Sequence, residues 1–322
     1  MVNFKDMRRA ITIITLIVLT FCAVPSAHSF WVWSPKSGKW SNPKYAVKPT
    51  PKEQLVYAKT VYSNKDYKNA REEFKRLIQY FPKSVEAAEG QFYLGLCDEA
   101  EDNYYQAYLD YQKMIEKYPF SERIQEAIEK EYKLAEEFMA GKKRKTMGVA
   151  LPVENPAIEI YKKVVDNSPF GPLAASAQYK LGLVLKGAGR YFEAEDEFNK
   201  VITTYPDSEW VSAAKFQIAS CKASLSRSPD YDQESTREAK SKFEEFVKEH
   251  PDAELSKEAI ENLKGLEEKE AQSSYEIGRF YEKRKIYGSA KIYYDTVIEK
   301  FPQSPWAAKC LERLKFMELH NK

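Results

Sequence analysis

The fold is decided by the stretch AREEFKRLIQYFPKS, residues 70–84. Its alanine, the phenylalanine four positions later and the leucine three positions after that lie along one side of an α-helix. Pro82 ends this helix because proline lacks a backbone donor and disfavours helical geometry in the residue before it. Ser84 is then placed to cap a following helix. The stretch therefore predicts a helix with one packed side, followed directly by a second helix.

The same pattern recurs in register along the chain. Twelve residues before each of six prolines there is an alanine, eight residues before there is an aromatic residue, and five residues before there is an apolar residue. The six prolines are Pro82, Pro119, Pro169, Pro206, Pro251 and Pro302, and the alanines are Ala70, Ala107, Ala157, Ala194, Ala239 and Ala290. Coincidences of this kind are not expected by chance, so the chain consists of repeated units.

A partner helix precedes most of these alanines. The pairs Tyr57-Ala58, Leu94-Gly95, Leu181-Gly182 and Ile277-Gly278 begin thirteen residues ahead of a repeat alanine. A small residue in a helix lets a neighbouring helix cross closely, so each unit is expected to be an antiparallel helix pair. Two of the cysteines, Cys97 and Cys221, fall at similar positions on such first helices and are expected to be small, buried, apolar residues.

At these offsets the Leu-Gly, Ala, aromatic and Pro positions resemble the tetratricopeptide repeat, over about residues 53–304. The resemblance implies an all-α, right-handed solenoid of about six helix pairs. Residues 305–320 read as a C-terminal capping helix, which gives an array over 53–322. Extra residues are expected to split the third pair near Gly141–Pro152 and the fifth pair near Ser226–Glu234. The chain between Pro251 and Ile277 is long enough to extend the first helix of the sixth pair.

Residues 1–29 have the pattern of a secretory signal peptide. Lys5, Arg8 and Arg9 precede a short, weakly polar to apolar run, and Ala27-His28-Ser29 offers small residues for cleavage before Phe30. Cys22 leaves a second interpretation open, because a lipoprotein signal also ends at a cysteine. The large Phe21 before it favours removal of Cys22 with the leader over its lipidation.

Residues 30–52 are expected to form an irregular aromatic segment between the leader and the array. It contains Trp31, Trp33 and Trp40, and exposed tryptophans are unfavourable unless they pack on something. Two interpretations stay open for these side chains. They fold back on the first repeat as a cap, or they contact a membrane or a partner.

Composition and motifs argue against other classes of function. Basic and acidic residues nearly balance, 50 against 48, whereas a nucleic-acid binder should show a basic excess or stripe. Cys97, Cys221 and Cys310 form neither a disulfide framework nor a zinc pattern, and the chain has only three histidines. Since it also lacks a Gly-rich phosphate loop, we expect no enzyme, no metal and no cofactor.

The turn phrases between the helices, together with the leader, further resemble the BamD type of outer-membrane assembly factor. Examples are Tyr80-Phe81-Pro82-Lys83-Ser84 and Ser168-Pro169-Phe170-Gly171-Pro172. The resemblance implies a periplasmic scaffold at the inner face of the outer membrane, with a BamA-type barrel protein and unfolded outer-membrane clients as partners. A periplasmic adaptor for cell division, peptidoglycan synthesis or envelope export remains open, because such repeat proteins share these phrases.

The first helices of a stacked array line an elongated concave surface. The predicted peptide groove in the early units consists of Gln54, Tyr57, Lys59, Tyr62, Gln91 and Tyr93. Aromatic groups of an extended segment would stack on the tyrosines there, and its backbone would bond to the polar side chains. In this hypothesis the early units hold client segments and the last two units dock on the assembly machine.

Overall fold

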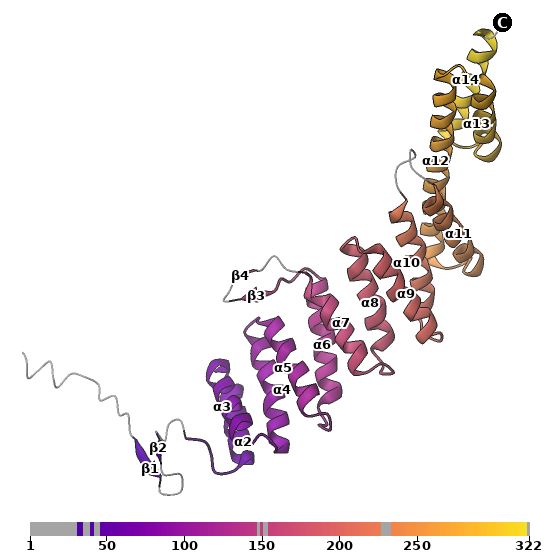
Figure 1. The fold of residues 1–322 in the computed structure, drawn as a ribbon. Coiled ribbons are helices and arrows are strands. Elements are labelled where there is room, and N and C mark those ends of the chain that lie inside the picture. The colour runs from indigo at the N-terminus through magenta and orange to yellow at the C-terminus, as the bar shows by residue number, and fades with distance from the viewer. Residues whose placement is uncertain are drawn as a thin grey trace, which may run out of the picture.

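The computed structural model describes residues 31–34, 39–41, 46–146, 149–150, 154–226 and 233–320 (Figure 1). Six helix pairs follow one another along an elongated array, and a last helix covers the C-terminal end. The pairs are α2 (Pro51–Ser63) with α3 (Tyr67–Tyr80), α4 (Val85–Ala100) with α5 (Tyr104–Lys117), α6 (Ile124–Met139) with α7 (Pro156–Asn167), α8 (Ala174–Gly187) with α9 (Tyr191–Thr204), α10 (Trp210–Leu225) with α11 (Glu234–Glu249), and α12 (Glu254–Lys283) with α13 (Tyr287–Lys300). The last helix is α14 (Pro305–His320). The all-α tetratricopeptide solenoid expected from the sequence is confirmed.

The repeated residues do what their spacing predicts. All six repeat alanines are fully buried, and so are the aromatic residues four positions later, such as Phe74 and Tyr294. Gly95, Gly182 and Gly278 lie directly against the aromatic residue of the partner helix, where a β-carbon would overlap the ring. The helix pairs can therefore approach closely because their contact surfaces combine a glycine with a large flat side chain.

Side-chain caps mark several of the helix starts. The Thr50 hydroxyl accepts a hydrogen bond from the Glu53 amide, and the Ser84 hydroxyl accepts one from the Ala87 amide at 3.1 Å. These contacts satisfy amides that have no partner inside the helix. Helix α2 thus begins at Pro51, two residues before the expected start of the array.

The two insertions and the long helix lie where they were expected. Between α6 and α7 the chain forms the short antiparallel strands β3 (Lys145–Thr146) and β4 (Val149–Ala150). The second insertion lies in the connection between α10 and α11. Helix α12 runs for 30 residues, and none of the described helices is long and apolar enough to cross a membrane.

The expectation of an irregular segment at 30–52 needs a correction. Strands β1 (Val32–Ser34) and β2 (Lys39–Ser41) pair as an antiparallel hairpin at the N-terminal end of the array (Figure 1). In the sequence, Trp33 and Trp40 alternate with smaller or polar residues, and only four residues separate the two strands, a pattern that favours a hairpin. The presence of tryptophans alone does not indicate strands. The leader at 1–29 and Cys22 lie outside the described residues, so their interpretation stays a prediction.

Candidate protein-binding surface

Two of the six predicted groove residues are not available to a peptide. Gln54 is fully buried, and its Nε2 donates to the main-chain oxygen and to Oε2 of Glu73 on the partner helix. Gln91 is 1% exposed and donates in the same way to Asp110. The prediction was wrong for both, since each stands four residues before a small residue that faces the partner helix and so shares its buried side.

That spacing was a signal which sequence reasoning missed. Gln178 also stands four residues before a repeat glycine, and it donates to Glu197 of α9. In all three units the acceptor follows the glutamine by 19 residues. The glutamines therefore fasten the first helix to the second within a unit and serve the fold.

The other four predicted residues form a packed cluster and one exposed ring. Lys59 pairs with Glu89 at 2.7 Å and lies 4.8 Å from the Tyr93 ring centroid. Tyr62 and Tyr93 are half-buried, with ring centroids 5.3 Å apart. Burial raises the pKa of the Tyr62 hydroxyl above its usual range. Only Tyr57 presents much of its ring to solvent, 40%, and Lys48 lies over it. Peptide binding by these four residues stays a prediction.

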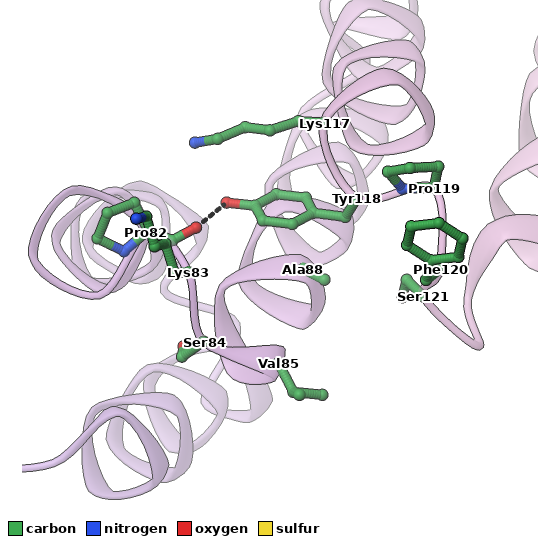
Figure 2. A pocket seen from close by; sticks show the side chains of 10 residues that line it. All are labelled: Pro82, Lys83, Ser84, Val85, Ala88, Lys117, Tyr118, Pro119, Phe120 and Ser121. Atoms are coloured by element: carbon green, nitrogen blue, oxygen red, sulfur yellow. Dashed lines mark hydrogen bonds between the residues drawn. The ribbon is translucent and has the colours of Figure 1, made fainter.

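A hollow surface lies instead at the turns that join the first three units. We call it the turn groove, a cleft of about 560 Å³ between α4 and the turn after α5 (Figure 2). Its lining consists of Pro82, Lys83, Ser84, Val85, Ala88, Lys117, Tyr118, Pro119, Phe120 and Ser121. The Tyr118 hydroxyl donates to the Pro82 oxygen at 3.3 Å and thereby ties one turn to the next.

The turn groove combines an apolar wall with a positive rim. Phe120 is 99% exposed and Val85 is 86% exposed, so two large apolar side chains stand almost wholly in solvent. The charged residues of the lining are Lys83 and Lys117, and neither forms an ion pair with a carboxylate in the described part of the chain. The N-terminus of α4 opens beside them and adds partial positive charge. Such a surface suits a partner segment with a bulky apolar side chain next to carboxylates.

The same turn geometry occurs again further along the array. The Tyr205 hydroxyl donates to the Pro169 oxygen at 2.9 Å, and Phe170 beside it is 90% exposed. An exposed phenylalanine directly after the turn proline was visible in the sequence at both places. Its significance was missed because the turn phrases were interpreted as helix ends and as a family resemblance, and not as exposed surface.

The buried thiols agree with the expectation of apolar filling. Cys97, Cys221 and Cys310 are free and fully buried. Burial raises their pKa values to about 12, 11 and 12, far from those of reactive thiols. In the part of the chain that the structure describes, no group of three or more His, Cys, Asp and Glu residues is placed to hold a metal ion.

Comparison with solved structures finds proteins of low sequence identity, several of them described as tetratricopeptide-repeat proteins. The C-terminal part of a repeat protein from Cytophaga hutchinsonii is 15% identical with a TM-score of 0.38, and the match covers 81% of this chain and 88% of that chain. The MamA protein is 18% identical with a TM-score of 0.35, covering 62% and 92%. A thermophilic repeat protein from Thermus thermophilus is 16% identical with a TM-score of 0.33, covering 66% and 99%. Comparison with curated proteins gives no match.

Comparison with protein families identifies two models. A tetratricopeptide-repeat model matches residues 57–84 and 89–121, the first two units of the array. A model described as YfiO, outer membrane lipoprotein, matches residues 155–321, from α7 to the C-terminal helix. Families of this kind typically consist of non-catalytic, protein-binding scaffolds. Since the second match spans more than half of the 322 residues, the chain belongs to the YfiO family of outer membrane lipoproteins.

Proposed function

We propose that this protein is a periplasmic scaffold of outer-membrane β-barrel assembly, held at the inner face of the outer membrane. In this function the first units bind segments of unfolded barrel clients, and the last units dock on a BamA-type barrel assembly protein. Membership in the YfiO family supports the place of action. The repeat array supports binding of other polypeptides as its mode of action, because stacked units present long surfaces to partners.

The turn groove is the observation that carries the client-binding part. An unfolded barrel segment alternates apolar and polar side chains, as every strand with two different faces does. Val85, Tyr118 and Phe120 can receive the apolar side chains, while Lys83 and Lys117 attract carboxylates at the rim. Phe120 and Val85 are already exposed to solvent, so a client can pack against them without a conformational change of the array.

Site-specific photo-crosslinking in a Gram-negative host tests the proposal. A photoreactive phenylalanine analogue replaces Phe120 in the turn groove, and in a separate variant it replaces Phe192 of α9, which is 68% exposed but does not line the groove. We expect unfolded barrel proteins among the products at position 120 and much less at position 192. A pull-down of the unmodified protein should recover a BamA-type partner.

Each alternative function has its own outcome. Recovery of division or peptidoglycan-synthesis proteins, without any barrel-assembly component, would replace the proposal by the adaptor function. Equal crosslinking of clients at both positions would remove the turn groove from the client path. In that case the exposed phenylalanines would act only as general hydrophobic surface.

A further inference from the structure

The N-terminal hairpin has one face made of tryptophan. Trp33 and Trp40 are direct partners in the β1–β2 ladder, so their side chains project to the same face. Trp31 stands two residues before Trp33, and side chains two apart on an extended chain share a face. The three indoles are 58%, 48% and 65% exposed in the order of the sequence. Three of the chain's five tryptophans thus form an apolar face that the array does not cover.

The charged residues next to these tryptophans in the sequence are of one sign. Residues 30–48 contain Lys36, Lys39, Lys44 and Lys48 and no acidic residue, and the first carboxylate after them is Glu53. The chain as a whole carries 50 basic and 48 acidic residues, so such a segment differs sharply from the rest. Lys48 lies over the Tyr57 ring at the start of the array. The segment that contains the three tryptophans is therefore basic in sequence.

We propose that the β1–β2 hairpin is a membrane-interface anchor that seats its tryptophan face among the headgroups of an anionic bilayer. Indole has an apolar body and a polar N–H, which favours the boundary between acyl chains and water. Lysines near an anionic surface add attraction that falls off within a Debye length. Stable attachment without a spanning helix requires two such signals together, and the hairpin supplies both.

Other occupants of the tryptophan face fit the observations less well. The exposure of all three indoles argues against their folding back on the first repeat, the alternative left open by the sequence. The turn groove cannot attract the hairpin electrostatically, because its rim also carries lysines. An acidic protein surface would satisfy the lysines, but three exposed indoles suit a lipid boundary better, because indole favours the boundary between acyl chains and water.

This anchor would act whether or not Cys22 carries a lipid, and it does not depend on client binding. With a lipid on Cys22, the hairpin follows the attachment point by fewer than 20 residues and would hold the array close to the membrane. With the leader removed, the hairpin is itself the attachment. Membership in a family of outer membrane lipoproteins places a bilayer within its reach.

Vesicle binding by the exported protein tests the anchor. The chain is produced with Cys22→Ala, which excludes lipid attachment, and mass spectrometry selects the product whose leader has been removed. Binding is measured by co-sedimentation with vesicles of phosphatidylcholine alone or mixed with phosphatidylglycerol. Quenching of tryptophan fluorescence by brominated acyl chains reports whether indoles enter the bilayer. We expect binding that requires phosphatidylglycerol and weakens with salt, together with quenching.

Two matched variants separate the hairpin from other apolar surface. Trp31→Ser/Trp33→Ser/Trp40→Ser should weaken vesicle binding at least about tenfold and abolish quenching, because burial of part of one indole already corresponds to a change of that size. Val85→Ser/Phe120→Ser, which removes exposed apolar groups from the turn groove, should bind vesicles like the parent protein. The circular dichroism and melting temperature of both variants show whether the array is intact.

Several results would overturn the anchor. These are the absence of binding to anionic vesicles, binding that the three tryptophan substitutions leave unchanged, and capture of an acidic protein by the hairpin without vesicle binding. Client crosslinking at position 120 should survive the tryptophan substitutions. Its loss when Val85→Ser is added to the protein with the analogue at position 120 would concern the proposed function and leave the anchor standing.

Discussion

At the scale of single residues, the helix pairs depend on three glycines where a β-carbon would not fit. Gly95, Gly182 and Gly278 touch the rings of Tyr111, Phe198 and Tyr294. Gly265, in the middle of α12, has nothing within 4 Å of the position of a β-carbon. The same residue type is therefore required by packing at three places and costs helix stability at the fourth.

Substitution of these glycines by alanine should act in opposite directions. Gly95→Ala forces a methyl group into the Tyr111 ring and should lower the free energy of unfolding by about 1–3 kcal/mol. Gly265→Ala should raise it by roughly 0.5–1 kcal/mol, because alanine restricts the unfolded chain and favours the helix. Urea denaturation followed by circular dichroism measures both. Equal effects of the two changes would contradict the close crossing at Gly95.

Glu131 is a buried carboxylate in the middle of α6. It is fully buried, Asn167 donates to its Oε2 at 3.4 Å, and its Oε1 has no hydrogen-bond partner among the described residues. Burial raises the pKa of Glu131 to about 8 from its ordinary value of 4.5. The folded protein therefore binds a proton that the unfolded chain releases in the intervening pH range.

The pH dependence of stability follows from that difference. Between about pH 4.5 and pH 8 the folded state holds more protons than the unfolded state, so the free energy of unfolding falls as the pH rises. Glu131→Gln removes this contribution. The stability of the variant relative to the parent should therefore increase across the window by roughly 2–4 kcal/mol and then level off. The matched change Glu129→Gln, at an exposed position of the same helix, is the control for the substitution itself.

At the scale of elements, the insertion in the third unit is tied down at both ends. Asn155 caps α7 by accepting from the Ala157 amide at 3.0 Å, and its Nδ2 donates to the Phe138 oxygen of α6 at 3.3 Å. In the loop between them, Arg144 lies 3.8 Å from the Tyr105 ring centroid and Lys142 lies 4.4 Å from that of Tyr104. The basic run thus packs on aromatic rings of α5.

Loss of the Asn155 side chain should therefore weaken both the cap and the link across the insertion. Asn155→Ala is expected to lower the free energy of unfolding by about 1–2 kcal/mol. Asn103→Ala is a suitable control, since Asn103 stands at the N-cap of α5 but makes no side-chain cap hydrogen bond. Its effect should be only a few tenths of a kcal/mol. Similar melting temperatures for both variants would exclude the capping role of Asn155.

At the scale of the whole molecule, the apolar core is divided along the array. The largest cluster extends from Phe92 of α4 to Cys221 of α10, and smaller clusters lie at both ends. Helix α12 takes part in two of them, through Leu266 on one side of its middle and Ala271 on the other. In a solenoid each unit contacts only its neighbours, so stability is expected to vary along the chain.

Hydrogen exchange at single-unit resolution tests this division with two equivalent valines. Val164 and Val297 hold the same repeat position, both are buried, and they belong to the largest and the C-terminal cluster. Replacement by alanine should cost about 1–3 kcal/mol at each site. Val164→Ala should speed exchange across α5–α9, whereas Val297→Ala should speed it only in α12–α14. Faster exchange throughout the chain for both variants would show one cooperative unit.

The sequence by itself determined the repeat, the six helix pairs, the two insertions and the long first helix of the sixth pair. It could do so because each unit is local: the alanine, the aromatic residue and the proline act within one helix or between neighbouring helices. Burial of the cysteines followed from the same register. The buried position of Gln54 and Gln91, four residues before a small residue, could have been predicted in the same way, although both were interpreted as binding residues.

Only the tertiary structure decided the surfaces. Whether Phe120 and Val85 face a groove or the core depends on how successive turns stack, which no single unit contains. The insertion likewise reaches back to α5 through contacts of residues about 40 apart in sequence, such as Lys142 with Tyr104. Three tryptophans share one exposed face because Trp33 pairs with Trp40 across a ladder. Composition shows that these residues are aromatic, but only the pairing in space determines that they form a surface.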